Sequence, residues 1–269
     1  VKMCIRDSSF SGVYPHDRGY DSILEEQIAG WLEEALALVP EDIKATARIV
    51  PGESEAAALS AAAEELGADL LVVGARKGGL LGRFQMGSAV NVLLHSAPVP
   101  VALAPRGYSH PGPISRVTTF FGPRQGTSDV IAIGLDRARR RGIPLRLVSL
   151  VLSGESDMQG LGTDVPSALN AYANRKLADS AQHMLDAGHA TTEVASGKDV
   201  AAALEKLDWE DGEIAVVGSS RMAVPGRLFL GTTASRMLRL IPVPMVVVPA
   251  GYMQAGEENN LLPKGGKNT

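Results

Sequence analysis

The sequence is poor in aromatic residues, which make up 4% of its 269 residues, and it contains a single cysteine. That cysteine, Cys4, excludes a disulfide framework and a cysteine-rich zinc site. Lysine and arginine number 26 against 30 aspartates and glutamates, so the chain lacks the basic excess of general nucleic-acid-binding proteins. No apolar run reaches the 18 residues of a membrane span. We therefore expect an aliphatic, alanine-rich core and neither a nucleic-acid nor a membrane partner.

The first ten residues follow neither the helical nor the strand period. Residues 1–8 resemble a translated sequencing-adapter remnant, so we leave residues 1–10 out of the predicted fold as an artefact. The sequence shows no secretory signal at its start, which predicts a cytoplasmic protein.

An internal repeat organises the rest of the chain. At a distance of 144 residues, Gly74 matches Gly218, and Pro-Val-Pro at 98–100 matches the same tripeptide at 242–244. Nine of the 32 positions from 74 to 105 are identical in the two copies, and most are glycine or proline, which fix backbone geometry. The chain is therefore a tandem duplication.

The second copy alternates strictly between strand and helix patterns. The predicted strands are residues 116–121, 144–152, 190–194, 213–217 and 243–248, and the predicted helices are residues 128–140, 165–187, 199–207 and 232–240. Such alternation, with near-continuous apolar strands, predicts an α/β fold with an open parallel sheet covered on both faces.

The first copy follows the same plan but lacks its beginning. Helices are predicted at residues 22–38, opened by a capping box at Ser22, and at 54–66, and strands at 46–50, 70–73 and 99–104. Before Gly74 this copy is 31 residues shorter than the second, or 39 without residues 1–8, which matches one strand-helix-strand unit. We expect a truncated first domain at residues 11–105, a linker at 106–113, a second domain at 114–249 and a disordered tail at 250–269.

A glycine loop joins a buried strand to a helix in each copy. The candidate ligand-binding residues are Gly74, Arg76, Lys77, Gly87 and Ser88 in the first copy and Gly218, Arg221, Gly231 and Thr232 in the second. Glycine lets a backbone approach phosphate, a hydroxyl adds a donor, and a helix amino terminus attracts anions. The simpler interpretation is structural: Ser88 and Thr232 are helix N-caps, and the glycines shape a turn. Capping and phosphate binding are compatible, so we keep both.

This arrangement, with Pro-Val-Pro before the last strand, resembles the universal stress protein (UspA) family over both copies, from about residue 20 to residue 249. The family motif is Gly, two residues, Gly, nine residues, Gly, then Ser or Thr. The resemblance implies two tandem Rossmann-like domains of strand order 3-2-1-4-5, with a ligand crevice at the carboxyl ends of the strands. It also implies ATP, with Mg²⁺, as the ligand.

Two departures from the family pattern bear on ATP. The second glycine of the motif is Lys77 in one copy and Arg221 in the other, which either fills the phosphate space or supplies a compensating charge. Nucleotide-binding members also carry an aspartate at the end of the first strand, where this chain reads Phe120-Phe121-Gly122.

Three functions follow as hypotheses. The first is a non-catalytic regulatory module of the stress response that holds ATP, the second a slow nucleotide hydrolase of a related α/β class, and the third a scaffold that contacts an unknown protein partner without a ligand. The sequence has no P-loop, no G-x-S-x-G elbow and no zinc-type histidine spacing, and we assign no catalytic or metal-binding residue.

The repeat yields two further expectations. The last strands of the two copies are apolar and edge-forming, so we expect them to pair within one chain as an intramolecular pseudo-dimer. We also expect the first loop to be the better phosphate site because it has extra glycines at 78, 79 and 82, whereas the second has Ala223, Val224 and Pro225 opposite residues 79–81.

Overall fold

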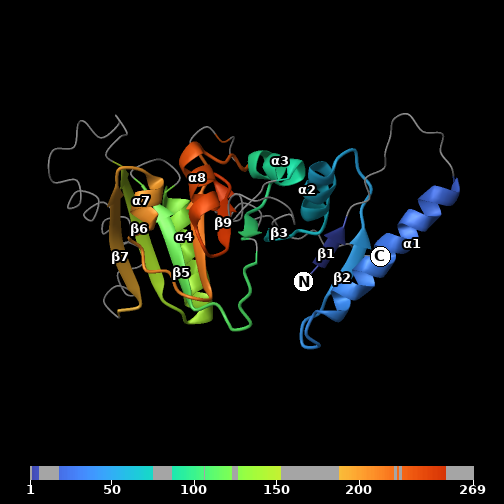
Figure 1. The fold of residues 1–269 in the computed structure, drawn as a ribbon, viewed down its shortest axis with the longest axis horizontal. Helices are drawn as coiled ribbons and strands as arrows, with labels where there is room; N and C mark the ends of the chain where they lie inside the picture. Colours follow the sequence, from blue (N-terminus) through green and yellow to red (C-terminus); the bar gives the residue numbers. More distant parts are fainter. Residues whose placement is uncertain are drawn as a thin grey trace, which may run out of the picture. The chain divides into compact units, whose positions relative to one another are not determined.

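The computed structural model describes residues 2–5, 18–74, 87–105, 107–122, 127–152, 188–220, 223 and 226–252. Its chain divides into two compact units, residues 1–68 and residues 69–269 (Figure 1). The division falls inside the first copy of the repeat. The last two strands of that copy therefore belong to the same unit as the whole second copy.

The first unit holds two parallel strands and two helices. Its elements are β1 (Lys2–Ile5), α1 (Arg18–Ala37), β2 (Thr46–Ile49) and α2 (Glu55–Glu65). α2 begins as predicted, because the Ser54 hydroxyl accepts a hydrogen bond from the Ala57 amide at 3.2 Å. The chain leaves α2 through Gly67, whose φ of +56° is a conformation that glycine adopts without strain. Ile28 and Leu32 of α1 and four alanines of α2 are buried in this unit.

Two predictions for the first unit are wrong. α1 begins at Arg18 rather than Ser22, so Ser22 lies inside the helix and does not cap it. Residues 1–8 were left out of the fold, yet Lys2–Ile5 form β1 and pair with β2 in register Lys2↔Thr46. Strand pairing uses backbone groups, so a segment without side-chain alternation still pairs along a free edge.

The second unit is built on one seven-stranded sheet of order β3-β4-β9-β8-β5-β6-β7. Its strands are β3 (Leu71–Gly74), β4 (Val101–Ala104), β5 (Arg116–Phe121), β6 (Leu145–Leu152), β7 (Ala190–Gly197), β8 (Glu213–Gly218) and β9 (Met245–Val248). All neighbours are parallel except β4 and β9, which are antiparallel. The second copy thus has the predicted order 3-2-1-4-5, read from β7 to β9.

Four helices of the second unit are described, namely α3 (Ser88–Ser96), α4 (Thr127–Arg141), α7 (Val200–Leu204) and α8 (Thr232–Leu240). α7 is shorter than predicted: it starts after the Asp199 N-cap, whose side chain accepts from Ala202, and ends at Leu204. The predicted helix at 165–187 and most of the predicted tail lie outside the described residues. None of the helices in the described ranges is long and apolar enough to span a bilayer.

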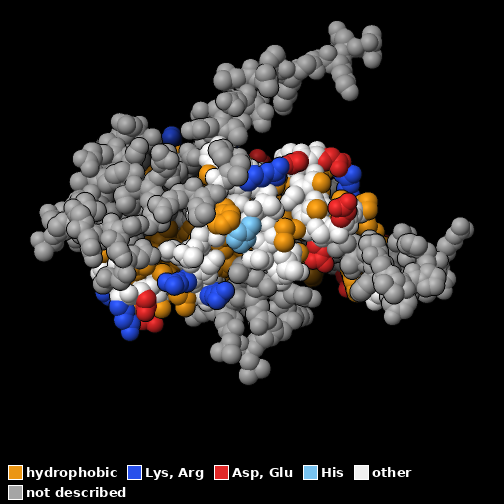
Figure 2. Space-filling model, turned by 90° about the horizontal axis from the view of Figure 1, so that it is seen from above, with side chains coloured by type: hydrophobic (Ala, Val, Ile, Leu, Met, Phe, Trp, Pro, Cys, Tyr) orange, Lys and Arg blue, Asp and Glu red, His pale blue; other side chains and the backbone are white. Residues whose placement is uncertain are grey.

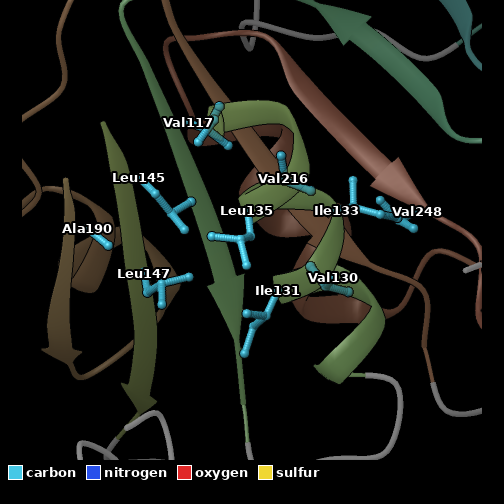
Figure 3. Packing of buried hydrophobic residues seen from close by; sticks show 11 residues of the cluster. Val117, Val130, Ile131, Ile133, Leu135, Leu145, Leu147, Ala190, Val216 and Val248 are labelled. Carbon is cyan, nitrogen blue, oxygen red and sulfur yellow. The ribbon is translucent and has the colours of Figure 1, made fainter. Parts of the chain in front are cut away.

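The main core of this unit lies between α4 and the sheet. Val130, Ile131, Ile133 and Leu135 of α4 form one buried cluster with strand residues of the second copy (Figure 3). The strand residues of this cluster are Val117, Leu145, Leu147, Ala190, Val216 and Val248. α4 connects β5 to β6, whereas α7 and α8 lie on the connections that lead to β8 and β9, in the opposite direction across the sheet. Because such crossovers are right-handed, α4 covers one face of the sheet and α7 and α8 cover the other.

The β4–β9 pair joins the two copies, as predicted for the last strands. Ala102 pairs with Val246, its own equivalent at the repeat distance of 144 residues. Val101 pairs with Val247, the equivalent of Leu103, and Leu103 pairs with Met245, the equivalent of Val101. This register is the one that a local two-fold axis through Ala102 and Val246 produces. Strand pairing within one chain is thus confirmed, while a pseudo-dimer of two whole domains stays a prediction.

Candidate functional site

The glycines of the two predicted loops end strands and begin helices. Gly74 ends β3 and Gly218 ends β8, while Gly87 and Gly231 immediately precede α3 and α8. Because β4 and β9 are antiparallel, β3 and β8 point in opposite directions and their two loops leave opposite edges of the sheet. The predicted residues therefore form two separate candidate sites, one in each copy.

The basic residues and most of the extra glycines of the loops lie outside the described residues. These are Arg76, Lys77 and Arg221, together with Gly78, Gly79 and Gly82. The greater capacity of the first loop for phosphate and the charge compensation by Lys77 or Arg221 both stay predictions.

The predicted N-caps are wrong by one residue. The N-caps are Gly87 and Gly231, with extended backbones (φ −66° and −73°), and neither has a side-chain capping bond. Their carbonyls accept the first helical hydrogen bonds, from Asn91 at 3.0 Å and Ser235 at 2.9 Å. Ser88 and Thr232 are already helical, a position from which a hydroxyl does not reach the amides that an N-cap serves.

The second loop folds back on itself through backbone bonds. The Ser220 amide donates to the Phe229 carbonyl at 2.8 Å, and the Phe229 amide donates to Ser219 Oγ at 3.2 Å. The Ser219 amide donates to Val248 at the end of β9 (2.8 Å), which fixes the start of the loop on the sheet. A Cβ on Gly231 would lie 3.3 Å from Ser220 Cβ, so the two ends of the loop meet at a position where glycine fits best.

The end of this loop rests on the helix of the other copy. The amides of Leu228 and Leu230 donate to the carbonyls of Ala97 and Leu94 at 3.0 and 2.9 Å, at the carboxyl end of α3. The ring of Phe229 meets the ring of His95 edge-on, with centroids 5.0 Å apart. Carbonyls that a helix end leaves without helical partners thus accept hydrogen bonds from the second glycine loop.

The strand order predicts a ligand crevice between the carboxyl ends of β5 and β8. There the chain leaves β5 toward β6 and leaves β8 toward β9, so the two connections diverge. β5 ends in Phe121, which is half-buried against the α4 core, followed by Gly122. At β8, a Cβ on Gly218 would lie 2.5 Å from Val130 Cγ2 of α4, so this glycine allows the helix to approach the strand end. The described ends of β5 and β8 contribute no carboxylate.

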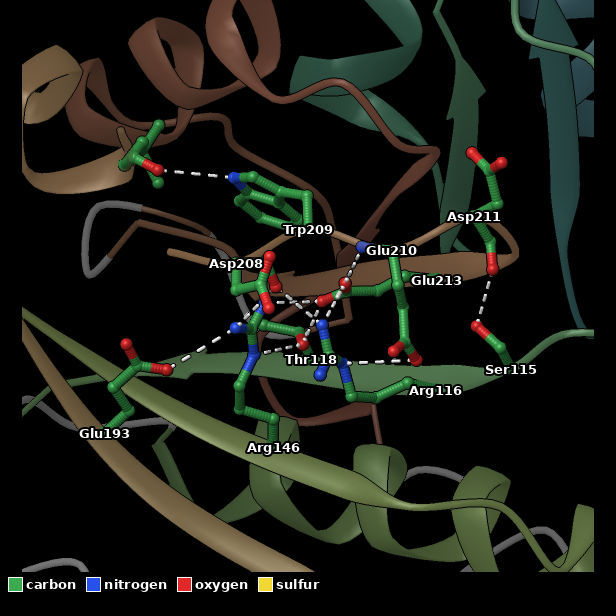
Figure 4. Close-up of polar contacts among 11 residues, drawn as sticks. Ser115, Arg116, Thr118, Arg146, Glu193, Asp208, Trp209, Glu210, Asp211 and Glu213 are labelled. Atoms are coloured by element: carbon green, nitrogen blue, oxygen red, sulfur yellow. Dashed lines mark hydrogen bonds and ion pairs between the residues drawn. The ribbon is translucent and has the colours of Figure 1, made fainter. Parts of the chain in front are cut away.

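A buried polar network that the sequence analysis missed occupies the opposite edge of the same strands (Figure 4). Glu213, the first residue of β8, is fully buried and receives Arg116 Nη2 at 2.6 Å and Arg146 Nη2 at 2.7 Å. The Thr118 hydroxyl also donates to Glu213, and Arg146 Nε donates to Thr118 at 3.0 Å. Each carboxylate oxygen therefore accepts a guanidinium, as a buried charge requires.

The loop before β8 completes this network. Arg116 and Arg146 both donate to the Asp208 carbonyl, at 2.7 and 3.0 Å. The Arg146 guanidinium lies 5.4 Å from the centre of the Trp209 ring. These bonds tie β5, β6 and β8 together, so the role of the network is structural; within it, the buried Arg116 Nε has only the ion pair with Glu210 Oε1 at 3.5 Å and no hydrogen-bond partner among the described residues.

The sequence did hold a signal for this network. Arg146 is the one charged residue inside the apolar run 144–152, and Glu213 is the first residue of the apolar strand 213–217. Charged side chains in buried strands need partners, so the two could have been expected to pair.

A cavity of about 530 Å³ lies near the same edge, where β4 ends and β9 begins. Its described lining includes Tyr108, Trp209, Glu210 and Asp211, hence carboxylates and aromatic rings but no lysine or arginine. Phosphates are not expected at such a surface. The glycine loops therefore remain the candidate anion sites. The described residues contain no group of three potential metal ligands.

The fold and the loops define a class of protein: a tandem α/β protein whose second copy has the Rossmann-like strand order 3-2-1-4-5. In each copy a glycine ends the strand next to the last one, which is β3 in the first copy and β8 in the second. The model of the Universal stress protein family matches residues 9–105 and 122–249. The chain belongs to the universal stress protein family.

Relatives and solved structures agree with this assignment. The chain is 33% identical over 203 residues to Universal stress protein Rv2319c of Mycobacterium tuberculosis and, equally, to Universal stress protein Mb2346c of Mycobacterium bovis, covering 73% of this chain and 69% of each relative. A universal stress protein from Archaeoglobus fulgidus superposes with a TM-score of 0.63 at 18% identity, covering 93% of this chain and 88% of that one. A Pseudomonas aeruginosa PAO1 protein, PA1789, gives 0.56 at 14%, with 96% and 85% covered. These structures support the fold.

Proposed function

We propose that this universal stress protein is a non-catalytic regulatory module of the stress response that binds ATP at its glycine loops. The observation that carries the proposal is the start of α8. Gly231 opens this helix without a side-chain cap, so the first-turn amides are not occupied by a protein oxygen from the N-cap. Free amides, a positive helix end and a neighbouring glycine suit a phosphate group.

The neighbouring residues fit such a ligand. Thr232 is the first residue of the helix, so its hydroxyl would add a further donor to a phosphate bound at this terminus. Glycine at 218 lets α4 approach the end of β8. The chain leaves β5 and β8 in opposite directions along the sheet, and ligands of open α/β sheets bind at such a point. Magnesium would enter with the nucleotide and be held by phosphates and water, which is its usual environment.

The scaffold hypothesis also has a specific observation behind it. β5 ends in Phe121, packed on the α4 core, where the resemblance to nucleotide-binding members requires an aspartate. Ser219 is already engaged by the Phe229 amide. The end of β5 thus offers no carboxylate to a nucleotide, and Ser219 Oγ already accepts one hydrogen bond. A protein without nucleotide affinity would act by protein contact alone.

Titration calorimetry with ATP and magnesium separates these functions. The matched variants are Gly231→Val and Gly87→Val, because a valine at either place crowds the helix terminus that would hold the phosphates. Both backbones are extended, which valine adopts readily, and at residue 231 the new Cβ also meets Ser220 Cβ at 3.3 Å. If both loops bind, each variant lowers the stoichiometry by one site, and loss with only one variant assigns the site to that copy. No heat with the unmutated chain would favour the scaffold. Steady release of ADP during the titration would favour the hydrolase.

A further inference from the structure

The carboxyl end of α3 needs hydrogen-bond donors from elsewhere in the chain. The last carbonyls of a helix have no partner within it, and amides that directly follow the helix commonly bond to them. After α3 and its C-cap Ala97 the chain reads Pro98-Val99-Pro100, so two of the next three residues lack an amide hydrogen. A segment from outside the helix must therefore supply donors.

These donors come from the exit of the second glycine loop. The amides of Leu228 and Leu230 donate to two carbonyls at this helix end. Arg227 Nη1 adds a third bond by donating to the Ser96 carbonyl at 3.3 Å. Both leucine side chains are buried, with 1% and 4% of their surface exposed. The loop exit is thus held on α3 by three hydrogen bonds and two buried side chains, all within the second compact unit.

The same short segment also holds the start of the loop. Phe229, between the two leucines, turns its backbone the other way: its carbonyl accepts from the Ser220 amide at 2.8 Å, and its amide donates to Ser219 Oγ at 3.2 Å. Leu230 directly precedes Gly231, the residue that opens α8 at the proposed phosphate site. Residues 228–230 therefore link the end of α3 to both ends of the second loop.

One ring contact joins the two copies at this point. The ring of His95 on α3 meets the ring of Phe229 edge-on, with centroids 5.0 Å apart. His95 Nδ1 donates to the Asn91 carbonyl at 2.7 Å, which holds the imidazole on its own helix. His95 is exposed and Phe229 half-buried, and Figure 2 shows a histidine side chain at the surface beside hydrophobic side chains. The ring contact can therefore be removed without opening the core.

We propose that His95 and Phe229 are positioning residues for nucleotide binding to the second copy, a role that rests on the proposed function. α3 of the first copy holds the loop exit where the first amides of α8 meet a phosphate, and the ring contact keeps α3 and the loop exit together. The nucleotide affinity of the second copy is thus set in part by the first copy. By reciprocity, a bound nucleotide strengthens the contact between the loop and α3.

NMR titration with ATP and magnesium, followed at the amides of Gly231 and Thr232, reports the second site by itself. His95→Ala and Phe229→Ala each remove the ring contact and should raise the Kd roughly two- to tenfold, as the loss of an aromatic pair does. Phe229→Tyr keeps a ring at the contact and should restore the affinity. Val92→Ala is the matched control, because it shortens an exposed valine one turn earlier on α3 and should leave the Kd unchanged.

Amide exchange separates positioning from a loss of stability. If a bound nucleotide strengthens the contact, exchange at Leu228 and Leu230 should slow about tenfold at ten times the Kd, and it should slow less in His95→Ala. The Ala215 amide, bonded to the Pro244 carbonyl at 2.9 Å, reports the stability of the sheet. Without ATP it should exchange equally in the unmutated chain and in the variants.

The results that would overturn this role differ from those that would overturn the proposed function. Unchanged Kd values in His95→Ala and Phe229→Ala would overturn the positioning role alone, as would an equal loss of affinity in Val92→Ala. ATP binding that leaves Gly231 and Thr232 unaffected would also overturn it. Absence of any ATP binding by the unmutated chain would overturn the proposed function and this role with it.

Discussion

The strand pair β3–β4 of the first copy is equivalent to the pair β8–β9 of the second. Comparing the two pairs shows that the burial of a side chain is set by its neighbours and not by its own residue type. Val72 and Val216 are the same residue at the same place in the repeat, and one is exposed while the other lies in a core. The strands form in both copies because each has a parallel neighbour. Burial differs because α4 and β5 flank the second, while no described strand pairs with the corresponding edge of β3.

The largest contrast is expected between Glu213 and its equivalent Asp69. Glu213→Gln removes the buried charge that two guanidiniums share, and we expect a loss of about 3–5 kcal/mol in unfolding free energy. Asp69→Asn changes an exposed acid and should cost less than about 0.5 kcal/mol. Urea unfolding followed by Trp209 fluorescence, in a Trp31→Phe background, reports the second unit alone. A loss of unfolding free energy at Glu213→Gln as small as that at Asp69→Asn would show that the network contributes no stability.

A smaller contrast is expected at the paired valines. Val216→Ala removes two methyl groups from the α4 core and should cost about 2 kcal/mol, including a cavity. Val72→Ala should change the free energy by less than about 0.5 kcal/mol, since most of that side chain is in water. The same fluorescence measurement applies. A cost at Val72 as large as at Val216 would mean that the first face is covered in solution.

The paired glycines sharpen the comparison further. Gly218→Ala forces Val130 to move, and we expect a loss at the lower end of about 1–3 kcal/mol. Gly74→Ala meets open space and should lie within about 0.5 kcal/mol of the unmutated chain. Thermal unfolding of the two variants side by side provides the measurement. The contrast fails if Gly74→Ala is the more damaging change.

The smallest expected effect concerns pH. Burial first, and then the charge of Asp69, raise the pKa of Tyr252, which is packed against the α4 core and donates to the Asp69 carbonyl at 3.3 Å. The folded chain therefore holds this proton more tightly, so the stabilisation is complete below the ordinary pKa of about 10 and is lost as pH rises through the folded value. Unfolding free energies at pH 9 and 11, in the unmutated chain and in Tyr252→Phe, should show a steeper alkaline loss without the substitution.

The strands and the repeat could be predicted from sequence because glycine, proline and apolar runs carry that information locally, whereas the second-copy strand order came from the resemblance to the family. β5 and α8 begin and end where predicted. The helix caps were missed by one residue, since a hydroxyl beside a glycine offers two N-cap candidates and only the backbone angles decide between them. The Arg116–Glu213–Arg146 network could not be located, because its members come together only through the pairing of β5, β6 and β8.

The most direct test of the contrast between the copies is native-state amide exchange at two matched pairs of residues. The amides of Leu71 and Ala215 are bonded to the carbonyls of Pro100 and Pro244 at 2.9 Å each. The amides of Val72 and Val216 point the other way, the first to an edge that no described strand pairs with and the second to β5. Our account predicts that Val216 exchanges at least about a hundredfold more slowly than Val72, a gap larger than that between Ala215 and Leu71. Val72 exchanging as slowly as Val216 would contradict it.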